Sequence, residues 1–246
     1  MAKNMGQRLV HLFLPNKGKK LLIVVDGISY ARYPVKTSLI TERDHIDTII
    51  RSYALPFLQK NDMLIISERI IAIMQRRSFL IRDIHPSWWA HFLSRFVSRH
   101  RGGIGLKSPY TMELALQEVG LVRILYASVC TMITKLFGLR GVFYHVVGSN
   151  INAIDGPCSY TLPPGNKSAK LGPKNPMQVA VRLSKLFHAP IVIIDANDYG
   201  VRVLGYSKGV NVSLVQKIFR DNPLGQSDEQ TPLAIVSKLF NTIKSG

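Results

Sequence analysis

The sequence predicts an α+β fold in which mixed β-sheets pack against helices, and three observations lead to this expectation. Short β-rich runs, as at Met63–Ile66 and Ile191–Ile194, are interspersed with helical patterns of unequal length, unlike a regular βαβ array. Neither GxGxxG nor a P-loop ending in Gly-Lys-Ser/Thr occurs, which argues against Rossmann and P-loop folds. The 246 residues, 46% of them hydrophobic, are enough to bury a sizeable core.

The first half of the chain begins with a predicted strand at Lys20–Val25 and a loop at Tyr33–Thr37. Apolar residues recur at helical spacing from Asp44 to Gln59. The polar triplet Ser67-Glu68-Arg69 then lies between two apolar segments. It either directs its groups at a ligand or marks a strand followed by a helix cap, and the sequence leaves both interpretations open.

Helical patterns dominate the middle of the chain. Trp88 and Trp89 fall in a predicted helix and are expected in the core or an interface, and Ser108-Pro109 begins another that ends at Gly120. Polar residues interrupt Leu121–Phe137, which predicts a buried helix rather than a membrane span. Beyond it we expect a strand at Val142–Val147 and helices at Met177–Phe187, Leu214–Phe219 and Leu233–Lys244. Residues 1–246 form one unit, or two closely joined subdomains with a boundary near 140–150.

The chain is strongly basic, with 32 Lys and Arg against 15 Asp and Glu and a formal charge of +17. Such a charge attracts polyanions. Because the basic residues are spread along the chain without an RNA-binding motif, a small anionic ligand is expected before nucleic acid. Only two cysteines and no signal-peptide pattern favour a reducing cytoplasm, and no membrane partner is expected.

Acidic and amide residues concentrate in three loops. The first holds Asp155, the second holds Asp195, Asn197 and Asp198, and the third holds Gln226, Asp228 and Glu229. Their oxygen atoms suit Mg²⁺ or Mn²⁺ together with substrate phosphates, while Lys36 and Arg69 are available to neutralise phosphate charge. Ordinary turn chemistry explains any one of these acids, and a solvated surface charge explains either basic residue.

Several segments resemble the coenzyme F420 gamma-glutamyl ligase-like family, from about Tyr33 to about Lys238. They are Gly141–Tyr144, Asn152–Pro157, Tyr160–Pro164, Asp195–Gly200 and Asp221–Pro232. The resemblance implies a ligase that uses GTP and divalent cations to join L-glutamate to the carboxylate of a phosphorylated deazaflavin. It also implies a homodimer with the unusual α+β fold of that family.

The resemblance assigns roles to individual residues. Asp155 and Asp195 match metal-binding, catalytic aspartates, and Gln226 matches a ligand of the second metal. The threonine metal ligand of the family is missing unless Asn197 or Asp198 substitutes for it. The nucleotide-contacting positions are then Lys36, Thr37, Ser67, Arg69, Gly225, Asp228 and Glu229. Gly156 and Pro157 replace the serine-asparagine pair of the ligases, and Ile73 stands where they carry a second lysine.

The sequence as a whole therefore predicts a GTP- or ATP-dependent ligase. It would form a gamma-glutamyl type amide between an anionic carboxylate acceptor and an amino acid such as L-glutamate. The departures from the family leave open a non-catalytic nucleotide- or anion-binding protein on the same fold. Nucleic-acid binding, which would weaken steeply with salt, is the third hypothesis.

Overall fold

The protein is described by a computed structural model covering residues 13–97, 105–139, 141–148, 151, 153–158, 162–197, 200–225 and 227–239. The chain divides into two compact units. The sheet unit comprises Met1–Met74 and Asn175–Gly246, and the helical unit comprises Gln75–Lys174. The division thus falls at 74/75 and 174/175, and not near 140–150 as the sequence indicated.

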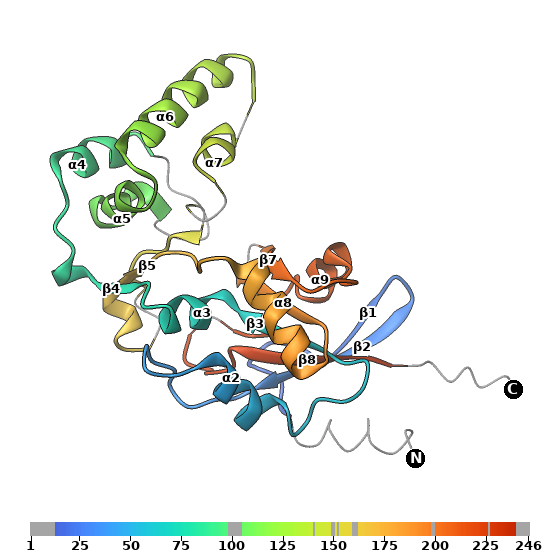
Figure 1. Cartoon of the computed structure of the whole chain (residues 1–246). Coiled ribbons are helices and arrows are strands. Elements are labelled where there is room, and N and C mark those ends of the chain that lie inside the picture. Colours follow the sequence, from blue (N-terminus) through green and yellow to red (C-terminus); the bar gives the residue numbers. More distant parts are fainter. Residues whose placement is uncertain are drawn as a thin grey trace, which may run out of the picture. The chain divides into compact units, whose positions relative to one another are not determined.

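A six-stranded mixed sheet organises the sheet unit, in the order β1-β2-β8-β3-β6-β7 (Figure 1). Strands β3 and β6 run parallel, and every other neighbouring pair is antiparallel. This arrangement confirms the predicted α+β class with a mixed sheet. The strands are β1 (Leu22–Val25), β2 (Ile28–Val35), β3 (Met63–Ser67), β6 (Ile191–Asn197), β7 (Gly200–Tyr206) and β8 (Leu233–Leu239).

Helices cover both faces of this sheet. On one face, Leu64 and Ile193 pack with α3 (Glu68–Met74) and α8 (Pro176–Phe187) and with α2 (Ile46–Ile49), which continues as a π-helical turn, Ile50–Ala54. On the other face, Ile65 and Val192 pack with α9 (Val212–Ile218). Because β3 and β6 are apolar on both faces, the sequence shows continuous apolar runs there rather than an alternating pattern.

The helical unit contains α4 (Trp88–Ser94), α5 (Pro109–Val119), α6 (Leu121–Leu136) and α7 (Val142–Val147), with a small antiparallel pair of β4 (Ser78–Leu80) and β5 (Ser168–Lys170). Ser87 and Ser108 cap α4 and α5 through their side chains, and Pro109 occupies the first turn of α5. The core of this unit includes Ile84, Leu106, Met112 and Ile124.

Several predictions about individual elements were wrong. Val142–Val147 is a helix and not a strand, and Leu233–Leu239 is a central strand and not a helix. Strand β2 continues to Val35, into the predicted loop. The helix at Leu121–Leu136 is confirmed, but on it only Ile124 and Ala127 are buried. Of the helices that the structure describes, none alone is long and apolar enough to cross a membrane; α5 and α6 pass that test only as a pair bent by 109°.

Candidate functional site

The candidate site lies at one edge of the six-stranded sheet, where β2 and β3 end and β8 begins. The strand registers place Val35, Leu233, Ile66 and Ile193 side by side in one row across four strands. Strand β2 ends and β8 begins in this row, and β3 ends one residue beyond it at Ser67, whereas β6 continues to Asn197 and still pairs with β7 there. We call this end of the sheet the carboxyl edge. Ligands of open sheets with parallel strands commonly bind at such an edge.

Three segments that the sequence assigned to a nucleotide lie at the carboxyl edge. Lys36 and Thr37 follow β2, and Ser67 ends β3 with Arg69 two residues beyond it. The loop 225–231 leads into β8, and its backbone is tied to both neighbours. The Thr37 amide donates to the Gln230 carbonyl at 2.9 Å, and the Ser67 amide donates to the Pro232 carbonyl at 2.8 Å.

Gly225 allows the loop 225–231 to fold back on itself. Its φ of 77° is in the left-handed region, and a Cβ atom there would lie 2.4 Å from the Glu229 carboxyl carbon. The Glu229 carboxylate in turn accepts a hydrogen bond of 2.7 Å from the Ser227 amide. Glu229 thus shapes this loop, whereas Asp228 next to it is exposed.

Buried polar side chains hold the base of this loop. Asn222 is fully buried and donates to the Gly225 carbonyl, and the buried Thr231 hydroxyl donates to the Leu224 carbonyl at 2.7 Å. Asn16 donates to both Thr231 Oγ1 and the Pro223 carbonyl. These bonds hold the described residues of the segment in place, as a preorganised ligand site requires.

An ion pair between a buried arginine and an exposed aspartate stabilises the start of the same segment. Arg32 on β2 is 1% exposed and binds the Asp221 carboxylate, and it also donates to the carbonyls of Lys20 and Ile218. Burial alone would raise the pKa of Asp221, but the hydrogen bond and charge of Arg32 outweigh it and lower that pKa. The sequence did not predict this pair, because two residues 189 positions apart carry no local signal.

The predicted metal ligands of β6 also lie in the sheet unit. Asp195 and Asn197 are two residues apart on β6, so both side chains project to the same face of the strand. Asn197 Oδ1 accepts a hydrogen bond of 3.1 Å from the Gly200 amide. A carboxylate and an amide oxygen on one face fit the preference of Mg²⁺ or Mn²⁺. Asp198 and Gln226 lie outside the described residues.

Asp155 belongs to the other unit. It forms a two-way backbone bridge with Lys170 of β5, and its carboxylate lies 3.7 Å from the buried Lys170 Nζ. The sequence grouped Asp155 with Asp195, and the structure places them in different compact units. Among the residues that the structure describes, no three His, Cys, Asp or Glu side chains group in a way that could hold a metal.

The charges at the carboxyl edge are of both signs. Lys36 is exposed and Arg69 is half-buried, while Asp195 is half-buried and Asp228 is exposed. Basic groups can neutralise phosphate oxygens, and carboxylates can hold the cation that accompanies a nucleotide. No protein-family model matches this chain, and comparison with curated proteins gave no match.

Proposed function

We propose that this chain is a metal- and nucleotide-dependent ligase with a gamma-glutamyl ligase-like fold. It would form a gamma-glutamyl type amide between an anionic carboxylate acceptor and an amino acid such as L-glutamate. The observation that carries the proposal is that Lys36, Ser67, Asp195 and the loop 225–231 all lie toward the same end of the strands of one sheet. These segments are distant from one another along the chain.

The residues at the carboxyl edge suit separate roles. Lys36 and Arg69 provide positive charge for the phosphates of GTP or ATP, and the loop 225–231 provides a fixed backbone surface beside them. Asp195 and Asn197 would hold a divalent cation, which supplies charge stabilisation for phosphoryl transfer. The role of Asp155 as a further metal ligand rests on the family resemblance.

The proposed reaction has two chemical steps. An acceptor carboxylate oxygen attacks the γ-phosphorus, and the bond from phosphorus to the bridging oxygen breaks, which gives an acyl phosphate and a nucleoside diphosphate. The amine of the amino acid then attacks the acyl carbon, and phosphate leaves as the amide forms and the amine loses a proton. The contribution of the protein is to position the two reactants and to stabilise the charge of the phosphoryl group.

Other parts of this proposal have narrower support. Cys130 and Cys158 are both unbridged, which fits the cytoplasm as the proposed compartment. A homodimer follows from the family resemblance. The net charge of +17 suits a phosphorylated acceptor as well as a nucleotide. We rank nucleic acid below small anions because the basic residues are spread along the chain without an RNA-binding motif.

The test is release of phosphate by the full chain. GTP or ATP, L-glutamate, Mg²⁺ or Mn²⁺ and a phosphorylated deazaflavin bearing a carboxylate are mixed, and each is omitted in turn. We expect release only in the complete mixture, and a loss of about 100-fold in Asp195→Asn. Asp26→Asn is the matched control, because Asp26 precedes β2 at the opposite edge and pairs with Lys217.

Either of two outcomes would count against the ligase. Nucleotide binding without release by any carboxylate acceptor would favour the non-catalytic binding protein. Equal turnover in Asp195→Asn and Asp26→Asn would remove the carboxyl edge from the reaction.

A further inference from the structure

The outer side of α6 carries an apolar stripe that the helical unit does not cover. Val122, Tyr126, Val129, Ile133 and Leu136 recur every three or four residues, so they lie on one face of the helix, and all five are exposed. The opposite face carries the buried Ile124 and Ala127. Thus α6 is apolar on two sides, and only one of them is buried against the core of the helical unit.

A second group of exposed apolar side chains lies on and just beyond α4. Trp88, Trp89, Phe92 and Phe96 are all exposed, and their rings touch in series. Trp88 and Phe92 are stacked with centroids 5.2 Å apart. We call these four residues the aromatic ladder. Tryptophan and tyrosine rings are enriched where an apolar phase meets water, because each ring has an apolar body and a polar group.

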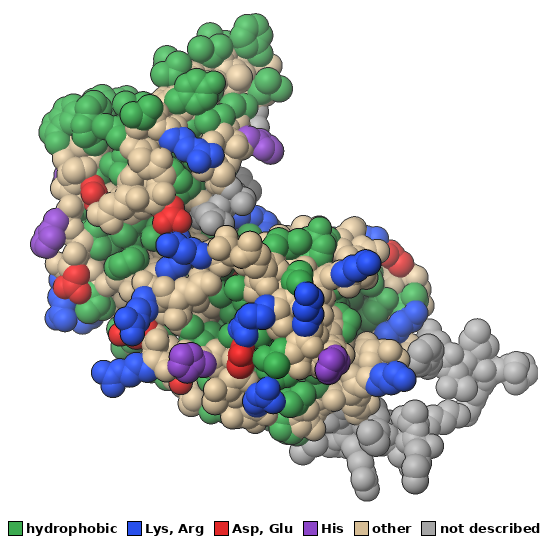
Figure 2. Space-filling model, in the orientation of Figure 1, with side chains coloured by type: hydrophobic (Ala, Val, Ile, Leu, Met, Phe, Trp, Pro, Cys, Tyr) green, Lys and Arg blue, Asp and Glu red, His purple; other side chains and the backbone are tan. Residues whose placement is uncertain are grey.

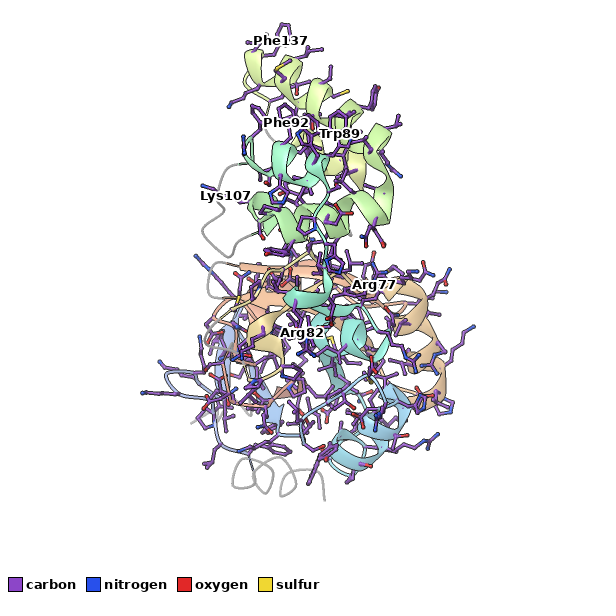
Figure 3. All side chains as sticks on the ribbon, turned by 90° about the vertical axis from the view of Figure 1, so that its left-hand side faces the viewer. Arg77, Arg82, Trp89, Phe92, Lys107 and Phe137 are labelled. Atoms are coloured by element: carbon purple, nitrogen blue, oxygen red, sulfur yellow. The ribbon has the colours of Figure 1, made fainter. Side chains whose placement is uncertain are left out.

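The stripe and the ladder belong to one region of the helical unit. Figure 2 shows hydrophobic side chains gathered over α4 and along the outer part of α6. Figure 3 shows Trp89, Phe92 and Phe137 toward one end of the helical unit, with Arg77 and Arg82 toward the other. An exposed apolar region of this kind on a folded protein marks a binding surface.

The charge around this region is positive. Residues 84–112 and 119–154 contain no Asp or Glu, whereas Arg95, Lys107, Arg123 and Lys135 are exposed in these stretches. All four acids of the helical unit are engaged within it. Glu113 accepts from Ser87, and Glu118, Asp83 and Asp155 lie in ion pairs with Arg77, Arg82 and Lys170.

The hydroxyl groups of α6 are satisfied by the helix itself. Ser128, Thr131 and Thr134 each donate to a carbonyl four residues earlier, at 2.7 to 2.8 Å. Hydroxyl groups bonded in this way lose no hydrogen bond to water when the helix enters an apolar phase, so their desolvation costs less.

We propose that the apolar stripe and the aromatic ladder bind the helical unit to an anionic membrane surface. The apolar side chains enter the boundary between headgroups and acyl chains, and the surrounding Arg and Lys contact anionic lipid headgroups. The protein then lies on the membrane and does not span it. This inference is independent of the proposed ligase, and it departs from the sequence-based expectation of no membrane partner.

Charge favours a lipid surface over a second copy of the chain. In a two-fold interface the same patch faces itself, so the Arg and Lys of one copy would approach those of the other. Glu118, Asp83 and Asp155 each have a basic partner, which leaves Glu113 against the exposed Arg95, Lys107, Arg123 and Lys135. An anionic lipid surface presents the complementary charge.

Both tryptophans of the chain are in the aromatic ladder, so intrinsic fluorescence reports directly on this face. The full chain is titrated with vesicles of phosphatidylcholine alone, or with about a third phosphatidylglycerol. We expect a blue shift and quenching by brominated acyl chains with the anionic vesicles, with an affinity that falls as salt is raised. Absence of a shift with anionic vesicles would overturn the proposal.

The double variant Met132→Glu/Leu136→Glu tests the surface of α6. Both positions are exposed and Glu is a good helix former, so the fold is retained, which circular dichroism checks. We expect the apparent affinity for anionic vesicles to fall about tenfold or more. Leu14→Glu/Leu39→Glu is the matched control, since Leu14 and Leu136 are 82% and 85% exposed and the control lies in the sheet unit.

Val122→Gln/Val129→Gln removes apolar contact without adding charge, and it is expected to weaken binding in the same direction. Equal binding by the wild type and both α6 variants would contradict a role for this helix. A second copy of the chain would instead cover this face if two results were found together. The wild type would form a dimer in sedimentation experiments that Met132→Glu/Leu136→Glu abolishes, and vesicles would leave the wild-type fluorescence unchanged.

Discussion

Gly225 and Glu229 together determine the path of the loop at the carboxyl edge. Sequence patterns place both residues correctly in a loop, because Gly and Pro flank a polar run there. They do not reveal that the Glu229 carboxylate packs where a Cβ atom of residue 225 would lie. This close approach depends on the folded path of the loop, and a local sequence pattern therefore cannot predict it.

Gly225→Ala tests that close approach. The added Cβ lies 2.4 Å from Glu229 Cδ at a positive φ, so we expect a loss of about 1–3 kcal/mol in the free energy of unfolding and a shifted loop. Gly209→Ala is the control, because Gly209 has a φ of 86° with nothing within 4 Å of the added carbon. Denaturant unfolding measures the free energy of unfolding of both variants. Equal losses would mean that Glu229 moves away from the added Cβ at no cost in stability.

The ion pair of Arg32 and Asp221 predicts a specific pH dependence. Burial opposes ionisation, but Arg32 outweighs it and lowers the folded-state pKa of Asp221 below its unfolded value of about 3.9. The pair therefore stabilises the fold above that unfolded pKa, and the stabilisation is lost as pH falls through the folded pKa.

Asp221→Asn removes the charge and leaves Arg32 buried. At neutral pH we expect it to lower the free energy of unfolding by about 2 kcal/mol, between the values typical of exposed and buried pairs. The difference from wild type should shrink at acidic pH, since the wild-type carboxyl is then protonated. Urea unfolding at several pH values measures it, and a difference that is constant with pH would exclude the ion pair as its source.

At the scale of elements, β8 and α7 show where local patterns mislead. Residues 233–239 include Leu, Ala and Lys, which favour helix, and the strand forms because β2 and β3 pair with it on both sides. Conversely, Val142–Val147 has a strand-like composition but forms a helix. This helix lies between Gly141 and Gly148, which both have positive φ, and the Arg123 side chain donates to the Val146 carbonyl. Both errors come from contacts that are distant in sequence.

The central position of β8 makes its apolar side chains important for stability. Ile235 is fully buried on the face covered by α8, so Ile235→Ala is expected to lower the free energy of unfolding by about 2–5 kcal/mol. Val181→Ala on α8 is the control, because Val181 is 37% exposed and its loss should be well under half as large. Chemical denaturation compares them, and similar losses would contradict the assignment of Ile235 to a tightly packed core.

At the scale of the whole molecule, the sequence predicted the class of fold and most of the segments of the candidate site. Buried strands such as β3 and β6 are apolar enough to recognise locally, and polar residues at their ends mark the carboxyl edge. The division into two units was not recognisable, because the helical unit is inserted between β-strands of one sheet without a low-complexity linker. For the same reason, the assignment of Asp155 and Asp195 to different units was not foreseen.

The proposed ligase depends most on a nucleotide site at the carboxyl edge, and calorimetry of GTP and ATP binding with and without Mg²⁺ tests this site directly. Lys36→Ala and Asp195→Asn change the edge, and Lys208→Ala is the matched control, since Lys208 is exposed beyond the opposite end of the sheet. We predict metal-dependent binding that Lys208→Ala retains and that each edge variant weakens about tenfold or more. Binding of neither nucleotide, or equal binding by all three variants, would contradict the account.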